Sequence, residues 1–174
     1  MATYYIKPAA NGGNDSNNGL TPSTAWATVG KALSASPGLS AGDIVYVAPG
    51  TYRESLSGHR EYLGNSGTEG NPIQIKGDPR ALQSWGNITP GIVRWTVFPT
   101  DNTNPVTGWI ILYANSKNYV KWESIYFDTW TSGYAINLNL CRGWSFTKCC
   151  FNSVQLNNQI FQLSNAAGVP YDFT

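Results

Sequence analysis

The sequence of 174 residues has little charge and no long apolar run. Charged residues make up 12% of it and the formal net charge is +1, so it lacks the basic stripe that would neutralise nucleic-acid phosphates. No stretch approaches 18 consecutive apolar residues, so no membrane-spanning helix is predicted. Residues 1–7 lack a basic segment followed by an apolar core, and no signal peptide is expected there. The sequence therefore argues against nucleic acid and membrane as partners.

Cysteine and histidine are also scarce. Cys141, Cys149 and Cys150 are an odd number without the paired spacing of a zinc site or a disulfide framework. Their disulfide state stays open. Adjacent residues of a strand point to opposite faces, so we expect Cys149 inside and Cys150 outside. His59, the single histidine, has no evident nucleophile or carboxylate partner and is interpreted as a surface residue.

The sequence does contain an internal repeat. Residues 116–128 and 140–152 read as two copies of one unit displaced by 24 positions (140 − 116 = 24). A period of this length is typical of solenoids, in which neighbouring coils bury one continuous core. Four pairs of large or apolar residues are predicted as adjacent rungs of that core: Val120 with Trp144, Trp122 with Phe146, Ile125 with Cys149, and Phe127 with Phe151.

Other segments predict short strands around a single helix. We expect strands at about residues 3–7, 43–47, 51–54 and 72–77, and again around 110–112, 136–140 and 161–163. A helix is predicted over about 24–35, with Ser23 or Thr24 as its N-cap. Excursions without periodicity are expected at about 55–71 and 78–108. We interpret residues 1–174 as one domain, in which 1–41 form the N-terminal strand, loop and capping helix and 42–174 form the coils.

Three segments resemble a known superfamily. Tyr4-Tyr5-Ile6-Lys7-Pro8, the run from Gly42 to Glu54, and the run from Asn71 to Gly77 are similar to the N-terminal cap and first coils of pectate-lyase-like right-handed parallel β-helix proteins. The resemblance implies an all-β solenoid of about five or six coils, with the helix covering the first one. That superfamily includes polysaccharide lyases and hydrolases, epimerases, bacterial surface proteins and phage tailspikes, so it implies a fold rather than one activity.

The predicted last coil has no evident cover. Residues 164–174 contain no amphipathic helix, so unpaired backbone groups would be left at that end. We expect another subunit of this chain, or another protein of the same assembly, to cover it.

No catalytic residues are predicted. Lyases of this fold need a basic side chain beside acidic residues that hold a cation, whereas Lys121 and Glu123 are replaced by Ser145 and Thr147 one repeat later. Glu123 and Asp128 lie too close to one corner to form the facing carboxylates of a glycosidase. We interpret these charges as an exposed polar surface.

Residues 15–19 place oxygen side chains at alternate positions, like the first half of a calcium loop. No glutamate completes that shell, so a network of Asx turns is the favoured interpretation and no cofactor is expected. Asp15 and Asn17 are the calcium candidates if an ion binds.

Aromatic residues outside the repeat are the stronger functional candidates. Rings at these positions could stack on sugars or bury against a neighbouring subunit, and the alternative is that they pack the excursions onto the coils. The candidates are Trp85, Trp95, Trp130 and Tyr134.

The leading functional hypothesis is a non-catalytic, structural β-helix module of a virion or extracellular assembly, such as a phage tail, tailspike or capsid-surface protein, in contact with glycans. A polysaccharide lyase or hydrolase, or the N-terminal portion of one, is the first alternative. A cell-surface adhesin or fibre subunit is the second. The expected partners are its own subunits, other assembly proteins and polysaccharide.

Overall fold

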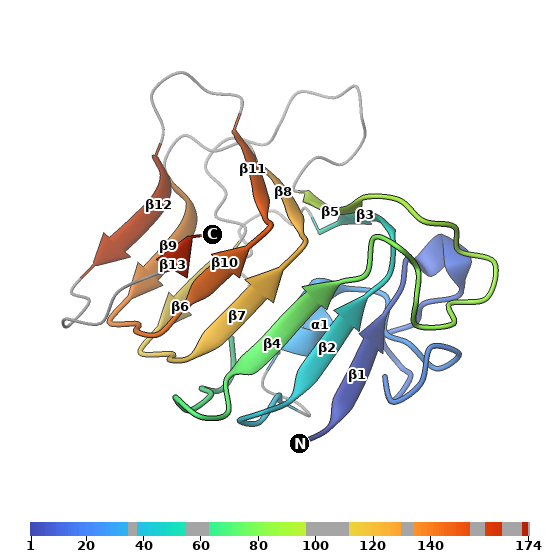
Figure 1. Ribbon diagram of the computed structural model, residues 1–174, viewed down its shortest axis with the longest axis horizontal. Coiled ribbons are helices and arrows are strands. Elements are labelled where there is room, and N and C mark those ends of the chain that lie inside the picture. Colours follow the sequence, from blue (N-terminus) through green and yellow to red (C-terminus); the bar gives the residue numbers. More distant parts are fainter. Residues whose placement is uncertain are drawn as a thin grey trace.

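The protein consists mostly of strands in parallel sheets (Figure 1). The computed structural model describes residues 1–34, 38–54, 63–96, 112–129, 134–153, 159–164 and 172–173. Within them, no helix is long and apolar enough to cross a membrane. The elements are β1 (Thr3–Ile6), the 3-10 helix η1 (Ala9–Asn11), α1 (Val29–Leu33), β2 (Ile44–Val47), β3 (Gly50–Arg53), β4 (Ile73–Gly77), β5 (Val93–Thr96), β6 (Leu112–Asn115), β7 (Val120–Glu123), β8 (Tyr126–Thr129), β9 (Tyr134–Asn139), β10 (Ser145–Thr147), β11 (Cys150–Ser153), β12 (Gln159–Ser164) and β13 (Asp172–Phe173).

The strands belong to three sheets that the chain visits in a fixed order. The six-stranded sheet runs β1-β2-β4-β7-β10-β13, the four-stranded sheet β11-β8-β5-β3 and the three-stranded sheet β12-β9-β6. From β4 onward each strand of the six-stranded sheet is followed by one of the four-stranded and one of the three-stranded sheet. Within each sheet, these strands pair in parallel with their neighbours. An all-β fold of parallel sheets is thus confirmed.

The predicted 24-residue repeat is the distance in sequence between paired residues of β7 and β10 and of β8 and β11. Lys121 pairs with Ser145 (145 − 121 = 24), and Tyr126 pairs with Cys150 at the same separation. Backbone corners follow the same spacing, because Ser124 (φ 56°) and Lys148 (φ 54°) both adopt the left-handed conformation. The segments that contain β7–β8 and β10–β11 are therefore paired in parallel with the same corner geometry.

The predicted core pairs lie on paired or aligned positions. Trp122 is the register partner of Phe146, with ring centroids 6.5 Å apart, and Phe127 is the partner of Phe151, at 5.0 Å. Trp95 extends the row, 5.7 Å from Trp122. Offset or edge contacts between aromatic rings each contribute about 0.5–1.5 kcal/mol beyond the area that they bury. This aromatic row packs neighbouring strands of the parallel sheets against one another.

The predicted faces of the two adjacent cysteines are confirmed. Cys149 is partly buried against the core, whereas Cys150 is exposed. Burial raises the pKa of the Cys149 thiol to about 11.

The N-terminal helix is shorter than predicted. It spans only Val29–Leu33, and its N-cap is Thr28, whose side chain accepts a hydrogen bond from Lys31 N, so the predicted caps Ser23 and Thr24 are wrong. Trp26, expected inside the helix, instead forms an extended bridge with Ile6. The helix starts late because residues up to Trp26 continue the edge of the six-stranded sheet.

One strand was missed by the sequence analysis. β5 lies inside the supposedly irregular segment 78–108 and pairs with β3 and β8; residues 97–108 lie outside the described part. Of the other predicted excursion, residues 63–71 are described and contain no helix or strand. β13 pairs with β10, so the six-stranded sheet continues into the segment 164–174, for which the sequence predicted only the absence of an amphipathic helix.

Candidate functional site

The outer face of the four-stranded sheet carries two registered rows of polar side chains. Side chains alternate across a strand, so the residues that flank the inward aromatic row point outward. The register pairs Thr51 with Arg94, Arg94 with Tyr126, and Tyr126 with Cys150. The second row, two residues further along each strand, consists of Arg53, Thr96, Asp128 and Asn152.

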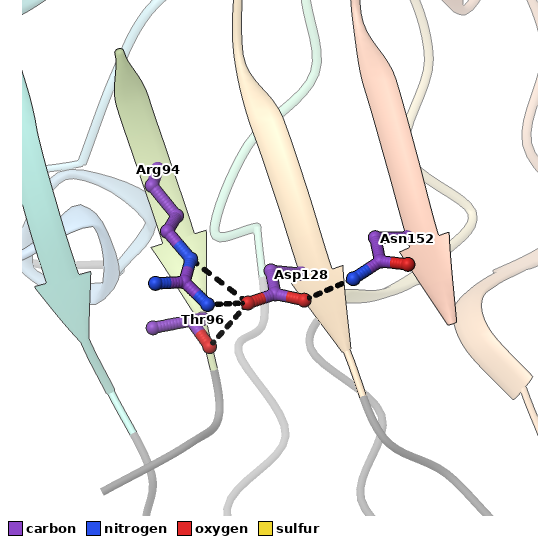
Figure 2. A network of polar contacts seen from close by, with 4 residues as sticks. All are labelled: Arg94, Thr96, Asp128 and Asn152. Atoms are coloured by element: carbon purple, nitrogen blue, oxygen red, sulfur yellow. Dashed lines mark hydrogen bonds and ion pairs between the residues drawn. The ribbon is translucent and has the colours of Figure 1, made fainter. Parts of the chain in front are cut away.

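A buried carboxylate connects the two rows (Figure 2). Asp128 is only 1% exposed. Arg94 Nε donates to Asp128 Oδ2 at 2.8 Å and Arg94 Nη2 contacts the same oxygen, while Asn152 Nδ2 donates to Asp128 Oδ1 at 2.9 Å. Thr96 Oγ1 lies 3.4 Å from Oδ2. These hydrogen bonds hold the Arg94 guanidinium, which belongs to β5, against Asp128 of β8. The Arg94 side chain remains 31% exposed.

Four adjoining depressions lie in a series on the surface, and Arg94 lines the first of them. The first, of about 490 Å³, is lined by Arg94, Thr51 and Tyr126, and it shares Ile92 and Tyr126 with a second of about 470 Å³. On the other side, the third and fourth depressions continue past the segment between β4 and β5 to η1, and each shares lining residues with its neighbour. We call the four together the furrow.

The furrow crosses the strands rather than following one of them. Thr51, Arg94, Tyr126 and Cys150 stand on four successive strands, which span about three spacings of 4.8 Å, or roughly 14 Å. Ile92, 66% exposed, provides an apolar side. An elongated depression with an apolar wall, an aromatic ring and a few fixed polar groups has the character of a ligand groove.

The charges that line the furrow are positive. They are Lys7, Arg94 and Lys148, and no acidic side chain of the described residues lines it. An arginine stays protonated and Arg94 is paired with Asp128, so it is suited to hydrogen bonding rather than to removing a proton. The arrangement can bind hydroxyl-rich or anionic ligands.

Glu123 and Asp128, the two carboxylates that the sequence analysis rejected as a glycosidase pair, lie in different sheets. Glu123 ends β7 of the six-stranded sheet, whereas Asp128 belongs to β8 of the four-stranded sheet and is buried in the network with Arg94. These two residues therefore do not face each other across a groove, in agreement with the expectation that they are not a glycosidase pair.

Two of the predicted aromatic contact residues are covered. Trp95 is 0% exposed inside the core, and Trp85 is 5% exposed in a second apolar cluster with Ala25 and Ala48. The indole N–H of Trp85 donates to Asp78 Oδ2 at 2.9 Å. The expectation of exposed rings is wrong for both. Trp85 packs its segment onto the sheets, as the alternative interpretation held, whereas Trp95 belongs to the strand β5 and faces the core. Trp130 and the side chain of Tyr134 lie outside the described residues.

The calcium candidates are engaged by the protein. Asp15 Oδ1 accepts from the backbone N–H groups of Ala27 (2.8 Å) and Thr28 (3.1 Å), and Oδ2 accepts from Thr28 Oγ1 at 2.8 Å. Asn17 Nδ2 donates to Ala25 O at 3.1 Å. These contacts anchor the entry to α1. No group of three or more His, Cys, Asp and Glu side chains that could hold a metal occurs in the described part of the chain. A calcium ion at this loop stays a prediction.

Sequence analysis missed the residues of the furrow. Arg94 and Ile92 were overlooked because β5 was not recognised, although Val93-Arg94-Trp95-Thr96 alternates as a half-buried strand does. Cys150 was placed correctly on the outside, but its neighbours across the sheet were unknown.

Comparison with known proteins gives one structural likeness of interest. No protein-family model matches the sequence, and no curated protein matches it. A solved structure of a rhamnogalacturonan lyase superposes with a TM-score of 0.51 and 22% sequence identity, over 84% of this chain and 34% of that one. The chain thus spans about a third of that lyase. At this identity the likeness supports the fold of parallel sheets and does not assign a function.

Proposed function

We propose that the chain is a right-handed parallel β-helix that binds polysaccharide along the furrow, as part of a polysaccharide lyase or hydrolase. The β-helix is supported by the fixed order in which the chain visits its three sheets and by the 24-residue pairing distance. The polysaccharide is supported by the likeness to a rhamnogalacturonan lyase and by the resemblance of the first coils to pectate-lyase-like proteins.

The observation that carries the proposal is the row of different side chains along the furrow. Arg94 offers N–H donors held by Asp128, Thr51 a hydroxyl, and Tyr126 an amphipathic ring. Aromatic rings bury the C–H faces of sugars, while fixed donors bind their hydroxyl and carboxylate oxygens. Successive units of an extended polymer would meet one of these groups after another.

Binding to immobilised or gel-embedded polymer tests the proposal. The parent chain should be retarded by rhamnogalacturonan or homogalacturonan, and Arg94→Gln and Tyr126→Ala should each weaken binding about threefold to tenfold, because each loses about 0.5–1.5 kcal/mol of contact. The matched control is Lys121→Gln, an exposed position on the outer face of the six-stranded sheet. Equal retardation of all four proteins would refute binding along the furrow.

Product analysis distinguishes the activities. A lyase releases an unsaturated sugar together with a new reducing end, whereas a hydrolase releases a reducing end alone. If folded protein binds polymer and releases neither, this chain contributes binding and the activity is refuted for it. The virion role predicted from the sequence draws no support from the described residues.

A further inference from the structure

A lysine stands almost fully buried at the η1 end of the furrow. Lys7 follows β1 and is only 8% exposed, yet its side chain has no ion-pair or hydrogen-bond partner among the described residues. A Cβ built on Gly12 would lie 3.8 Å from both Cε and Nζ of Lys7. This places the ammonium beneath the turn that closes η1.

The same lysine lines a depression of about 410 Å³ with a polar wall. Its other lining residues come from two segments far apart in the sequence: Ala10 and Asn11 from η1, and residues 85–88 from the connection between β4 and β5. Figure 1 shows these two segments side by side at one end of the six-stranded sheet. The two asparagine side chains, Asn11 and Asn87, can donate and accept hydrogen bonds there.

No carboxylate of the described residues forms an ion pair with this ammonium. Asp78 is the acidic residue tied to the same wall, and its Oδ2 accepts from Gln83 N (2.9 Å) and Trp85 Nε1 (2.9 Å). It forms no ion pair with Lys7 within the described part of the chain. The stem of Lys7 is enclosed by the protein, whereas its residue lines the depression and its ammonium has no partner among the described residues. An opposite charge supplied by a ligand would pair with it there.

We propose that this depression binds an oxyanion carried by a hydroxylated ligand of monosaccharide size, with Lys7 Nζ as the counter-charge. The amides of Asn11 and Asn87 bind the ligand's hydroxyl groups. The site stands at one end of the furrow, but Lys7 would bind the oxyanion there whether or not a polymer binds at Arg94.

Titration calorimetry of the whole chain with glucuronate, glucose 6-phosphate and glucose tests the proposal. At least one of the anionic sugars should bind at least tenfold more tightly than glucose, and the tighter one identifies the oxyanion as carboxylate or phosphate. If neither anionic sugar binds more tightly than glucose, the proposal is overturned.

Two variants test the role of the lysine. Lys7→Met keeps the length of the side chain and should abolish the preference for anionic sugars, while the ligand-free variant melts at or above the parent temperature because an unpaired cation is gone. Lys121→Met, on an exposed face, is the matched control and should change neither property. A markedly lower melting temperature for Lys7→Met would show that the ammonium has an internal partner, which overturns the proposal.

A third variant does not touch the buried position. Asn87→Asp, at an exposed wall residue, introduces a carboxylate that should pair with Lys7 and lower the affinity for the anionic sugar at least tenfold; unchanged affinity would overturn the proposal. Arg94→Gln should leave small-anion binding intact, so failure of this site and failure of polymer binding are distinguishable.

Discussion

Replacing Asp128 by Asn should lower the free energy of unfolding by about 2 kcal/mol. The carboxylate is 1% exposed and receives N–H groups from Arg94 and Asn152. Hydrogen bonds to a charged group contribute about 1.5–3 kcal/mol. The amide keeps the size and one oxygen but can present an NH2 group to the guanidinium. Because the Arg94 side chain is 31% exposed, water screens the stranded cation and holds the loss below that of a fully buried pair.

Urea unfolding of four proteins measures the interaction energy between Arg94 and Asp128 separately from the effect of each single substitution. The parent, Asp128→Asn, Arg94→Gln and the double variant form a cycle, and the coupling energy should fall within about 0.5–3 kcal/mol because the two residues are in direct contact. Replacing both by apolar residues, as in Arg94→Met with Asp128→Leu, should cost less than Asp128→Asn alone, since no charge is then left unpaired. If Asp128→Asn unfolds within about 0.5 kcal/mol of the parent, the range of ordinary surface substitutions, the network does not stabilise the sheet.

Two further predictions concern the stacking of coils and the cysteine faces. Gly143 has a φ of +66°, and a Cβ there would lie 2.4 Å from the Tyr119 ring. Gly143→Ala should therefore lower the free energy of unfolding in urea by at least about 1–2 kcal/mol. The control is Gly70→Ala, where a Cβ meets nothing within 4 Å, and equal losses of stability in the two variants would refute the close packing of Gly143 on Tyr119. Near pH 8, an alkylating reagent should modify the exposed Cys150 well before Cys149, because burial raises the pKa of Cys149 to about 11. Labelling of both thiols at one rate would contradict the burial of Cys149. The pKa of Cys149 lies above its ordinary value of 9.0. The stability contributed by the protonated thiol is therefore complete below about pH 9 and is lost as the pH rises towards 11.

The sequence was most informative where the chain repeats. Trp122 and Phe146, or Phe127 and Phe151, are 24 positions apart, and stacked parallel strands require like residues at that spacing, so core and register followed from the pattern alone. It was least informative at β5, because Val93–Thr96 stands 32 positions before its partner in β8 (126 − 94 = 32). The same strand stands 43 positions after its partner in β3 (93 − 50 = 43). These two irregular spacings hid the strand and, with it, the neighbour of Tyr126.

The predicted start of the N-terminal helix was wrong for a different physical reason. Helical spacing relates Trp26, Val29, Ala32 and Leu33. A local pattern cannot show, however, that Trp26 is held in an extended conformation by tertiary contacts. Its ring stacks on Tyr4 at 4.9 Å, and its indole N–H donates to Asn17 O at 2.9 Å. Packing of one large aromatic residue outweighs the modest helix propensity of a few residues.

The candidate site depends on what the repeat leaves unconstrained. Inward positions must be filled by large apolar groups in every coil, since a gap or a charge there would cost several kcal/mol. Outward positions only have to remain solvated, and on the four-stranded sheet they change from Thr51 to Arg94, Tyr126 and Cys150 over four successive strands. A regular scaffold thus presents a different side chain about every 4.8 Å. A ligand lying across the strands meets a sequence of unlike groups at a nearly constant spacing, and an extended polymer can meet all of them without bending.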